Sequence, residues 1–271
     1  MTSAGWITRD VLITVKAYPN PSSKYGETVC VAGVTREEGW IRLYPVTFRD
    51  LPDPLKFRKY QWVSVRLKKH QSDNRPESYR PDLTSLRPGE FVSAKDGWKR
   101  RKGLLLPTLS ASMCEIQRLQ LTSGKSLGMF RPASVEDFII EDLEQEWDAR
   151  RREILGQGMF FSRRTKALER IPYRFMYRYR CADPHCKGYK QSIVDWEIAE
   201  LYRNVRGKRR APEKIKELIR HKFFDELCSR HRETHFFVGN MAKHTRTFLV
   251  LGVFYPRASK EGASESRTLF G

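Results

Sequence analysis

The segment that most constrains the fold is a strict alternation of side chains near the middle of the chain. Its odd positions are all aromatic, and its even positions are arginines except for one methionine; in order they are Tyr173, Arg174, Phe175, Met176, Tyr177, Arg178, Tyr179 and Arg180. A period of two is that of a β-strand, because successive side chains point to opposite faces. The pattern predicts a strand with one aromatic face and one basic face, and the basic face points to a polyanionic partner.

The residues after this strand predict two helices and a hairpin. Apolar residues recur with helical spacing over residues 191–205, and Pro212 suits the first position of a second helix. Apolar runs then flank a polar turn within residues 235–255. We therefore expect a C-terminal α+β unit with the order strand, helix, helix, hairpin, which is either zinc-ribbon-like or winged-helix-like.

The first half of the chain is dominated by short strand patterns separated by turns. Strands are predicted over residues 11–18, 27–34, 40–46, 61–69, 113–121, 127–132 and 135–141. Such spacing is typical of a small barrel or a sandwich. Residues 70–103 are polar and contain three Arg-Pro pairs, so we expect a long basic surface loop there.

Two adjacent segments carry a resemblance to a known family. The matching residues are Cys30, Val31, Ala32, Gly33, Val34, Gly39, Trp40, Ile41 and Arg42. They resemble the opening of the dual-OB domain family, in which a C-(V/I)-A-G-hydrophobic stretch precedes G-x-W-I-R-P. Here Leu43 and Tyr44 intervene before Pro45, and the resemblance covers only the start of the chain. It implies a pair of OB-like barrels that bind nucleic acid and have no known catalytic role.

Together these patterns predict a β-rich α+β protein. We expect one or two OB-like barrels over residues 1–141, a helical linker over 142–170, the strand-helix-helix-hairpin unit over 171–258 and a flexible tail over 259–271. The N-terminus lacks the basic and apolar regions of a signal peptide, and no apolar run has the length of a membrane helix. A soluble, cytoplasmic protein without a membrane partner is therefore expected.

The composition indicates an anionic partner. Lysine and arginine number 51 against 32 aspartate and glutamate residues, which gives a net charge of +19 and an isoelectric point near 9.9. Such an excess attracts the phosphates of DNA or RNA. The candidate contacts are a tryptophan, as a stacking platform, and clustered cations: Trp98, Lys99, Arg100, Arg101, Lys102, Arg163, Arg164, Arg174, Arg178, Arg180, Lys208, Arg209 and Arg210. Ribosome association or an acidic protein partner is the alternative.

The expected function is non-catalytic binding of the phosphate backbone, as a subunit of a larger nucleoprotein, genome-defence or mobile-element assembly. The alternative is a metal-dependent nuclease with Asp195 and Glu197 as its carboxylates. Positions i and i+2 of a helix point about 200° apart, so these carboxylates can share one ion only if their segment is extended. Asp195 could instead begin the helix and favour its dipole.

Five cysteines at uneven spacing argue against a disulfide framework and for a reducing compartment. Cys181 and Cys186 form a C-x4-C pair, and Cys228 and His231 form a C-x2-H pair near the end of the second helix. Four such ligands would make a structural zinc site. In the alternative interpretation, the cysteines only fill a strand end, a turn and a helix stripe.

Overall fold

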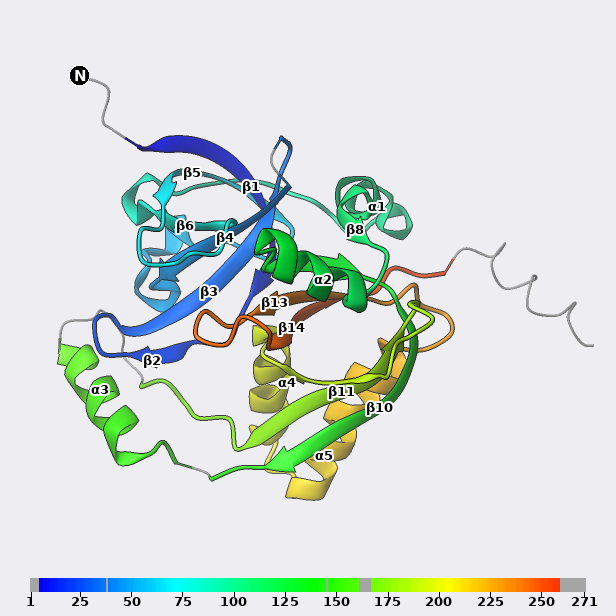
Figure 1. The fold of residues 1–271 in the computed structure, drawn as a ribbon. Helices are drawn as coiled ribbons and strands as arrows, with labels where there is room; N and C mark the ends of the chain where they lie inside the picture. Colours follow the sequence, from blue (N-terminus) through cyan, green and yellow to red (C-terminus); the bar gives the residue numbers. More distant parts are fainter. Residues whose placement is uncertain (1–4, 38, 145, 161–166, 259–271) are drawn as a thin grey trace, which may run out of the picture.

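The computed structural model describes residues 5–37, 39–144, 146–160 and 167–258, which form two β units packed against each other (Figure 1). The first unit, drawn in blue and cyan, is a closed barrel. The second, drawn in green to orange, is a curved sheet with helices packed against it. In the part of the chain that the structure describes, no helix has the length and apolar character needed to cross a membrane.

Five strands close the barrel. They are β1 (Ile7–Lys16), β3 (Gly26–Thr35), β4 (Gly39–Val46), β5 (Gln61–Lys69) and β6 (Ser78–Pro81). Their neighbour order is β1-β3-β4-β6-β5, and β5 pairs back with β1. All pairs are antiparallel except β4 with β6. Two short strands extend this sheet, since β2 (Asn20–Ser22) pairs with β3 and β7 (Arg87–Phe91) pairs with β5.

Strand β1 is buried on both of its faces. Val11 and Ile13 belong to the cluster that fills the barrel. Leu12 and Val15 belong to a second cluster, which includes Phe237 of the other unit. A strand covered on both sides has a continuous apolar run rather than an alternating one, which explains the sequence VLITV.

Seven strands form the second sheet. They are β8 (Leu109–Ser110), β9 (Leu127–Phe130), β10 (Pro132–Asp142), β11 (Tyr173–Cys181), β12 (Tyr189–Ile193), β13 (His235–Asn240) and β14 (Phe248–Phe254). Their order is β10-β11-β12-β14-β13-β9-β8, and in the described residues the edge strands β10 and β8 do not pair with each other. Only β12 with β14 and β8 with β9 are parallel.

The helices lie mostly in the second half of the chain. They are α1 (Lys99–Leu105), α2 (Met113–Ser123), α3 (Ala149–Phe160), α4 (Trp196–Arg206) and α5 (Pro212–Arg220), which continues as a π-helix over His221–Glu226. Single 3₁₀ turns occur at Phe48–Asp50, Asp53–Leu55, Leu83–Ser85, Asp96–Trp98 and Leu106–Thr108.

The alternating segment forms β11, as its period predicted. Phe175, Tyr177 and Tyr179 are buried in one cluster with residues of α4 and α5, and the arginines between them are exposed. The prediction of one aromatic and one basic face is confirmed. The broader prediction of a β-rich α+β protein with a small barrel is also confirmed.

The prediction of a strand over residues 113–121 was wrong, because these residues form α2. The Ser112 hydroxyl accepts the N–H of Glu115 at 3.0 Å, and the Glu115 carboxylate accepts the N–H of Ala111 at 2.6 Å. These reciprocal bonds act like a capping box. Gly124, with φ of +74°, ends the helix in the left-handed region. Capping therefore outweighs the strand-like pattern.

Other expected elements are placed differently. Residues 70–103 are not a plain loop, since they contain β6, β7 and part of α1, and β6 is needed to close the barrel. The strands between residues 109 and 142 join the second sheet, so they do not form a second barrel. The β13–β14 hairpin lies inside that sheet between β9 and β12, so it is not the exposed wing of a winged helix. The described part of the expected helical linker over residues 142–170 contains one helix, which begins at Ala149, and the first residue of the linker belongs to β10.

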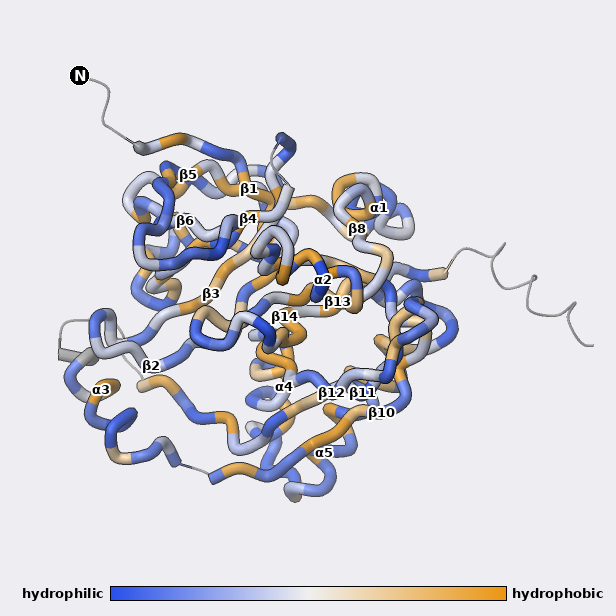
Figure 2. The backbone as a smooth tube through the Cα atoms, in the orientation of Figure 1, coloured by the Kyte–Doolittle hydropathy of each residue, from blue (hydrophilic) through white to orange (hydrophobic). Residues whose placement is uncertain are grey.

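A buried arginine joins the two units. Arg42 of β4 is 1% exposed, and its guanidinium donates to the Ser126 hydroxyl at 2.7 Å and to the Ser126 carbonyl at 3.0 Å. A buried charge is costly unless it is hydrogen-bonded, so these contacts favour one position of the barrel on the sheet. Figure 2 shows apolar stretches, in orange, passing through the centre of the molecule where the units meet.

Candidate nucleic-acid interface and metal centre

Trp98, the tryptophan expected to stack on a base, is partly buried and packs against the core. The centroid of its ring lies 5.7 Å from that of the Tyr60 ring and 5.3 Å from that of the Phe254 ring. Trp98 packs against the cluster between the two units. Arg101 is 5% exposed; its Nε donates to the Val92 carbonyl at 2.9 Å. Arg101 is therefore held in the core and not at the surface where the sequence placed it, whereas stacking by the partly exposed Trp98 stays a prediction.

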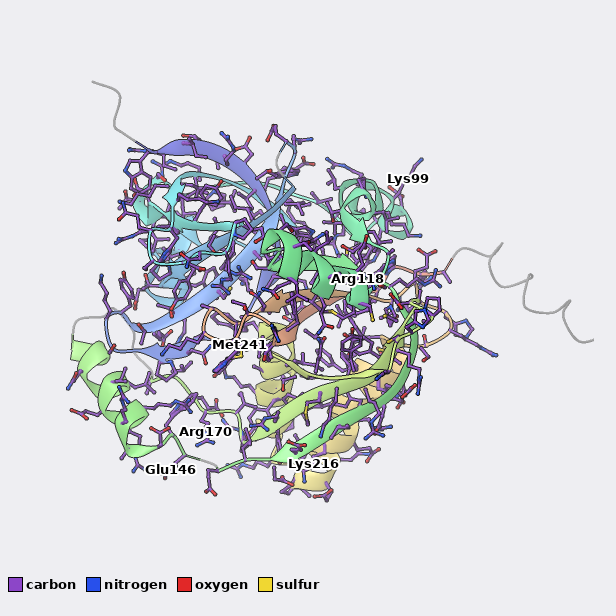
Figure 3. The ribbon with its side chains drawn as sticks, viewed as in Figure 1. Lys99, Arg118, Glu146, Arg170, Lys216 and Met241 are labelled. Atoms are coloured by element: carbon purple, nitrogen blue, oxygen red, sulfur yellow. The ribbon has the colours of Figure 1, made fainter. Side chains whose placement is uncertain are left out.

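The remaining cations of this run lie near the surface. Arg100 forms an exposed pair with Glu90 at 2.5 Å, and the ammonium of Lys102 lies 2.6 Å from the Glu233 carboxylate. Lys99 is exposed on α1, as labelled in Figure 3, and has no ion pair among the described residues. Of these three cations, Lys99 can therefore contact a phosphate without first breaking an ion pair.

The arginines of β11 face solvent but are partly neutralised. Arg174 lies 3.4 Å from the Glu141 carboxylate, and Arg180 lies 2.9 Å from the Glu136 carboxylate, both across to β10. Arg178 is exposed, with no ion pair in the described part of the chain. Exposed pairs of this kind are weak, so the arginines remain able to exchange a carboxylate for a phosphate.

The other predicted cations lie elsewhere. The turn between α4 and α5 carries Lys208, Arg209 and Arg210, all exposed and without an ion pair in the described residues. Arg163 and Arg164 lie outside the described residues. The predicted cations thus lie on several separate elements, and the sequence did not indicate which of them share one surface.

A groove beside β11 combines aromatic and basic side chains. Its volume is about 420 Å³, and the side chains relevant here are Tyr18, Trp147, Arg151, Arg170, Tyr173, Arg174 and Met241. Figure 3 labels two of them, Arg170 and Met241. The guanidinium groups of Arg151 and Arg170 lie 5.7 and 5.6 Å from the Trp147 ring. The one carboxylate in the lining, that of Asp195, is buried and paired with a lysine, so the groove carries a net positive charge.

The carboxylates of the nuclease alternative converge on a lysine. The ammonium of Lys59 lies 3.4 Å from Asp195 and 2.9 Å from Glu197. Both can reach it because Asp195 precedes α4 in an extended conformation and caps the helix, accepting the Glu197 N–H at 3.1 Å. A Cβ on Gly252 would lie 3.1 Å from Asp195 and 3.2 Å from Lys59, so the pair is packed closely. Lys59 thus takes the place between the two carboxylates where the nuclease alternative needs a metal ion, and the metal-ligand group found among the described residues does not include them.

The lysine of this cluster keeps its charge. Burial alone would lower the pKa of Lys59, but the carboxylates of Asp195 and Glu197 outweigh burial and raise that pKa well above its usual value. Lys59 belongs to the barrel and Asp195 to the second unit. The cluster is thus an ionic contact between the units, and no sequence pattern indicated Lys59.

Three thiols meet on the opposite side of the second unit. The sulfur atoms of Cys114, Cys181 and Cys186 all lie within 4.8 Å of one another, and these residues could hold a metal ion. The Cys114 and Cys181 sulfurs are 3.5 Å apart. The sequence identified Cys181 and Cys186 but missed Cys114, which lies far away in the chain and has no ligand-like spacing to the pair.

The other two predicted zinc ligands are not part of this group. The Cys228 thiol donates to the Phe223 carbonyl at 3.4 Å, and burial raises the pKa of that thiol to about 12. His231 is exposed. Among the described residues, no fourth cysteine, histidine or carboxylate joins the three thiols. The expected pairing of Cys181 and Cys186 with Cys228 and His231 was therefore wrong.

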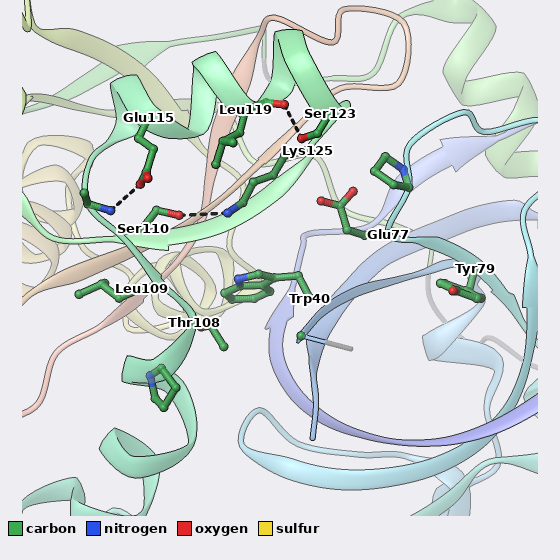
Figure 4. Close-up of a pocket in the computed structure, with 14 residues that line it drawn as sticks. Trp40, Glu77, Tyr79, Thr108, Leu109, Ser110, Glu115, Leu119, Ser123 and Lys125 are labelled. Carbon is green, nitrogen blue, oxygen red and sulfur yellow. Dashed lines mark hydrogen bonds between the residues drawn. The ribbon is translucent and has the colours of Figure 1, made fainter. Parts of the chain in front are cut away.

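A second groove lies where the barrel meets β8 and α2. It measures about 890 Å³, and Figure 4 shows its lining, including Trp40, Glu77, Glu115 and Lys125. Both carboxylates are engaged, Glu77 with the N–H and hydroxyl of Ser126 and Glu115 with the backbone ahead of α2. Two carboxylates against one lysine make this groove less suited to phosphate than the one beside β11.

Two family matches divide the chain where the two units divide. Residues 7–107, which contain the barrel, match the family described as Domain of unknown function (DUF8758). Residues 109–271 match the family described as Domain of unknown function (DUF8757) and include every strand of the second sheet. A comparison with curated proteins finds no significant match. Since the second match spans more than half of the sequence, the chain belongs to the family of Domain of unknown function (DUF8757).

Proposed function

We propose that this chain binds nucleic acid, DNA or RNA, through the phosphate backbone and without catalysis. The observation that carries the proposal is the groove beside β11, where aromatic rings lie among Arg151, Arg170 and Arg174. Aromatic side chains stack on unpaired bases and arginines neutralise phosphates, so the combination suits a single strand better than a duplex. The net charge of +19 supports the same class of ligand.

The strand order of the barrel supports this function. Taken along the chain, the five strands neighbour one another as first, second, third, fifth and fourth, and the third and fifth are parallel. This order is similar to that of an OB fold, a Greek-key barrel that binds oligonucleotides, and it supports an OB-like assignment. Tyr18 and Asn20 of the groove lie in the connection between the first and second strands, one of the loops that OB folds use. An OB-like barrel agrees with the resemblance to the dual-OB family.

Two further parts of the proposal concern partners. The chain acts as a subunit of a larger nucleoprotein assembly, in which other chains hold part of the strand. A structural zinc ion is bound by Cys114, Cys181 and Cys186. Weak binding by the isolated chain, together with stoichiometric co-purification of other subunits with nucleic acid, would support the first of these statements.

The experiment measures binding of labelled single- and double-stranded DNA and RNA by fluorescence anisotropy, across a salt series. The test variant changes Arg151, Arg170 and Arg174 to alanine together. The matched control changes Arg66, Arg80 and Arg87, three exposed arginines of the barrel unit, so both variants lose the same charge. Parallel samples contain Mg²⁺ and are examined for cleavage.

We expect the groove variant to bind single strands at least tenfold more weakly than the control variant. The salt dependence of its binding should also fall, because each lost phosphate contact on a single strand removes about 0.7 from the log–log slope, or about 2 for three contacts. Equal losses in both variants would mean that overall charge, not the groove, holds the strand. Cleavage that requires Mg²⁺ would overturn the non-catalytic assignment.

A further inference from the structure

The three thiols come from three separate elements. Cys114 is the second residue of α2, Cys181 ends β11, and Cys186 lies in the loop before β12. Cys181 and Cys186 are 4% and 9% exposed. The cluster therefore lies where α2 meets the β11–β12 hairpin, and anything bound there joins these elements.

Hydrogen-bond donors are directed at the sulfurs. The Cys186 sulfur accepts the backbone N–H groups of Cys181 and Gly188, both at 3.4 Å. Gly188 has φ of +89°, a conformation that side chains disfavour, and this turn directs its N–H back to the sulfur. Backbone hydrogen bonds of this kind orient a sulfur, as outer hydrogen bonds do for the ligands of metal sites.

The N-terminus of α2 favours negative charge at this place. Cys114 lies in the first turn of an eleven-residue helix, where the unpaired N–H groups carry a partial positive charge. One turn further on, Arg118 binds the carboxylate of Asp183 at 2.8 Å, and Asp183 lies between the two other cysteines. This pair links α2 to the loop that connects the other two cysteines.

The sulfur spacing fits a single tetrahedral ion. With Zn–S bonds of about 2.3 Å, two sulfurs on one zinc ion lie about 3.8 Å apart. The observed separation of 3.5 Å between Cys114 and Cys181, and the limit of 4.8 Å for all three, agree with that spacing. An iron–sulfur cluster usually takes four cysteines, and the described residues place three here.

We propose that Cys114, Cys181 and Cys186 form a three-thiolate Zn²⁺ site whose fourth position is held by water. The hydroxyl of Tyr189 lies 3.0 Å from the Cys114 sulfur and 3.0 Å from the Gln117 side-chain carbonyl. It therefore supports a ligand from outside the coordination shell, as outer hydrogen bonds commonly do at metal sites. This inference rests on the zinc statement of the proposed function and is independent of nucleic-acid binding, so each can fail alone.

The first experiment measures zinc in protein purified without chelators. Wild type should contain about one zinc ion per chain, and Cys114→Ser should lose it or bind it at least tenfold more weakly. The matched control is Cys228→Ser, which alters a thiol of the same unit that lies outside the cluster and should keep full occupancy. Zinc loss in Cys228→Ser together with full occupancy in Cys114→Ser would restore the ligand set expected from the sequence and overturn this one.

A second experiment reads the ligands directly in the unaltered protein. Wild type reconstituted with Co²⁺ should show strong thiolate-to-metal charge-transfer absorption and the visible bands of a tetrahedral ion. Zinc should displace the cobalt, and zinc at about a thousandfold excess over its dissociation constant should raise the thermal midpoint by roughly 10 °C. Purified wild type that holds no zinc and gives no charge-transfer band with Co²⁺ would show that the three thiols only pack together.

Discussion

Replacing Lys59 by methionine tests the ionic contact between the two units. The lysine is 9% exposed and Asp195 is 2% exposed, so the substitution leaves a buried carboxylate without its cation. Methionine has a similar length and fills the space of the lysine stem. The change therefore removes the charge and little of the packing.

The expected cost is large for a single substitution. Removing one partner of a buried ion pair typically costs about 3–5 kcal/mol, because the remaining charge is neither solvated nor paired. Glu197 is half exposed and can turn to water, so Asp195 accounts for most of the loss. Against a total stability of about 5–15 kcal/mol for a folded domain, such a loss is easily measured.

The assay is urea denaturation of the wild type and three variants, followed by tryptophan fluorescence and circular dichroism. Lys59→Met should shift the midpoint strongly. The double variant Lys59→Met with Asp195→Asn should recover most of the loss, because asparagine still caps α4 and leaves no buried charge. Lys56→Met, which breaks the exposed pair with Asp53 three residues upstream, is the matched control and should leave the midpoint unchanged.

Two results would refute this reasoning. If Lys59→Met and Lys56→Met shift the midpoint equally, the buried pair contributes no more than a surface pair. If the double variant is as unstable as Lys59→Met, the lysine stabilises the protein through its packing and not through the carboxylate. A transition that splits into two steps in Lys59→Met alone would instead strengthen the assignment of this contact to the interface between units.

Three shorter predictions follow. Gly239→Ala places a Cβ within 2.9 Å of two leucine side chains and should cost about 1–3 kcal/mol in urea denaturation, whereas Gly103→Ala, with open space around it, should cost nothing. Tyr177→Phe leaves a buried carbonyl of the π-helix without its 2.6 Å hydrogen bond and should cost about 1–2 kcal/mol by the same assay. Burial would raise the pKa of Asp73, but hydrogen bonds from Arg75 outweigh it and hold that pKa well below its usual value. The stability that this provides is present above about pH 4 and is lost as the pH falls further. An acid titration in which Asp73→Asn unfolds at the same pH as wild type would contradict this.

The period of two in β11 predicted both the element and its faces, because a strand buried on one side imposes that period on the sequence. The α2 segment was misread although its local signal was present. Ser112 and Glu115 have the spacing of a capping box, and Gly124 marks the end of the helix. The apolar residues of this short helix also fit the spacing of a strand, and the capping residues are what distinguish the two elements.

The parts of the site that the sequence did not indicate depend on long-range contacts. Lys59 and Asp195 are 136 positions apart, and Cys114 and Cys181 are 67 apart. Spacing rules for ion pairs and metal ligands apply within a helix, a turn or a short loop, so they contain no information about such pairs. Similarly, the cationic run after Trp98 was expected at the surface because lysine and arginine are usually exposed. Arg101 is buried because the rings of Tyr60, far from it in sequence, and of Trp98, in the turn before α1, lie against its guanidinium.

The segment that resembles the dual-OB family indicates what its residues do in this fold. Ile41 lies in the barrel core, Trp40 lines the groove shared with β8 and α2, and Arg42 donates to Ser126 of the second unit. Adjacent strand residues point to opposite faces, so Ile41 and Arg42 cannot both serve the barrel interior. One face of β4 packs inside the barrel. The other face carries the buried guanidinium of Arg42, which finds hydrogen-bond acceptors on Ser126, outside the barrel. A Trp-Ile-Arg strand of this kind therefore indicates a barrel attached to a second unit.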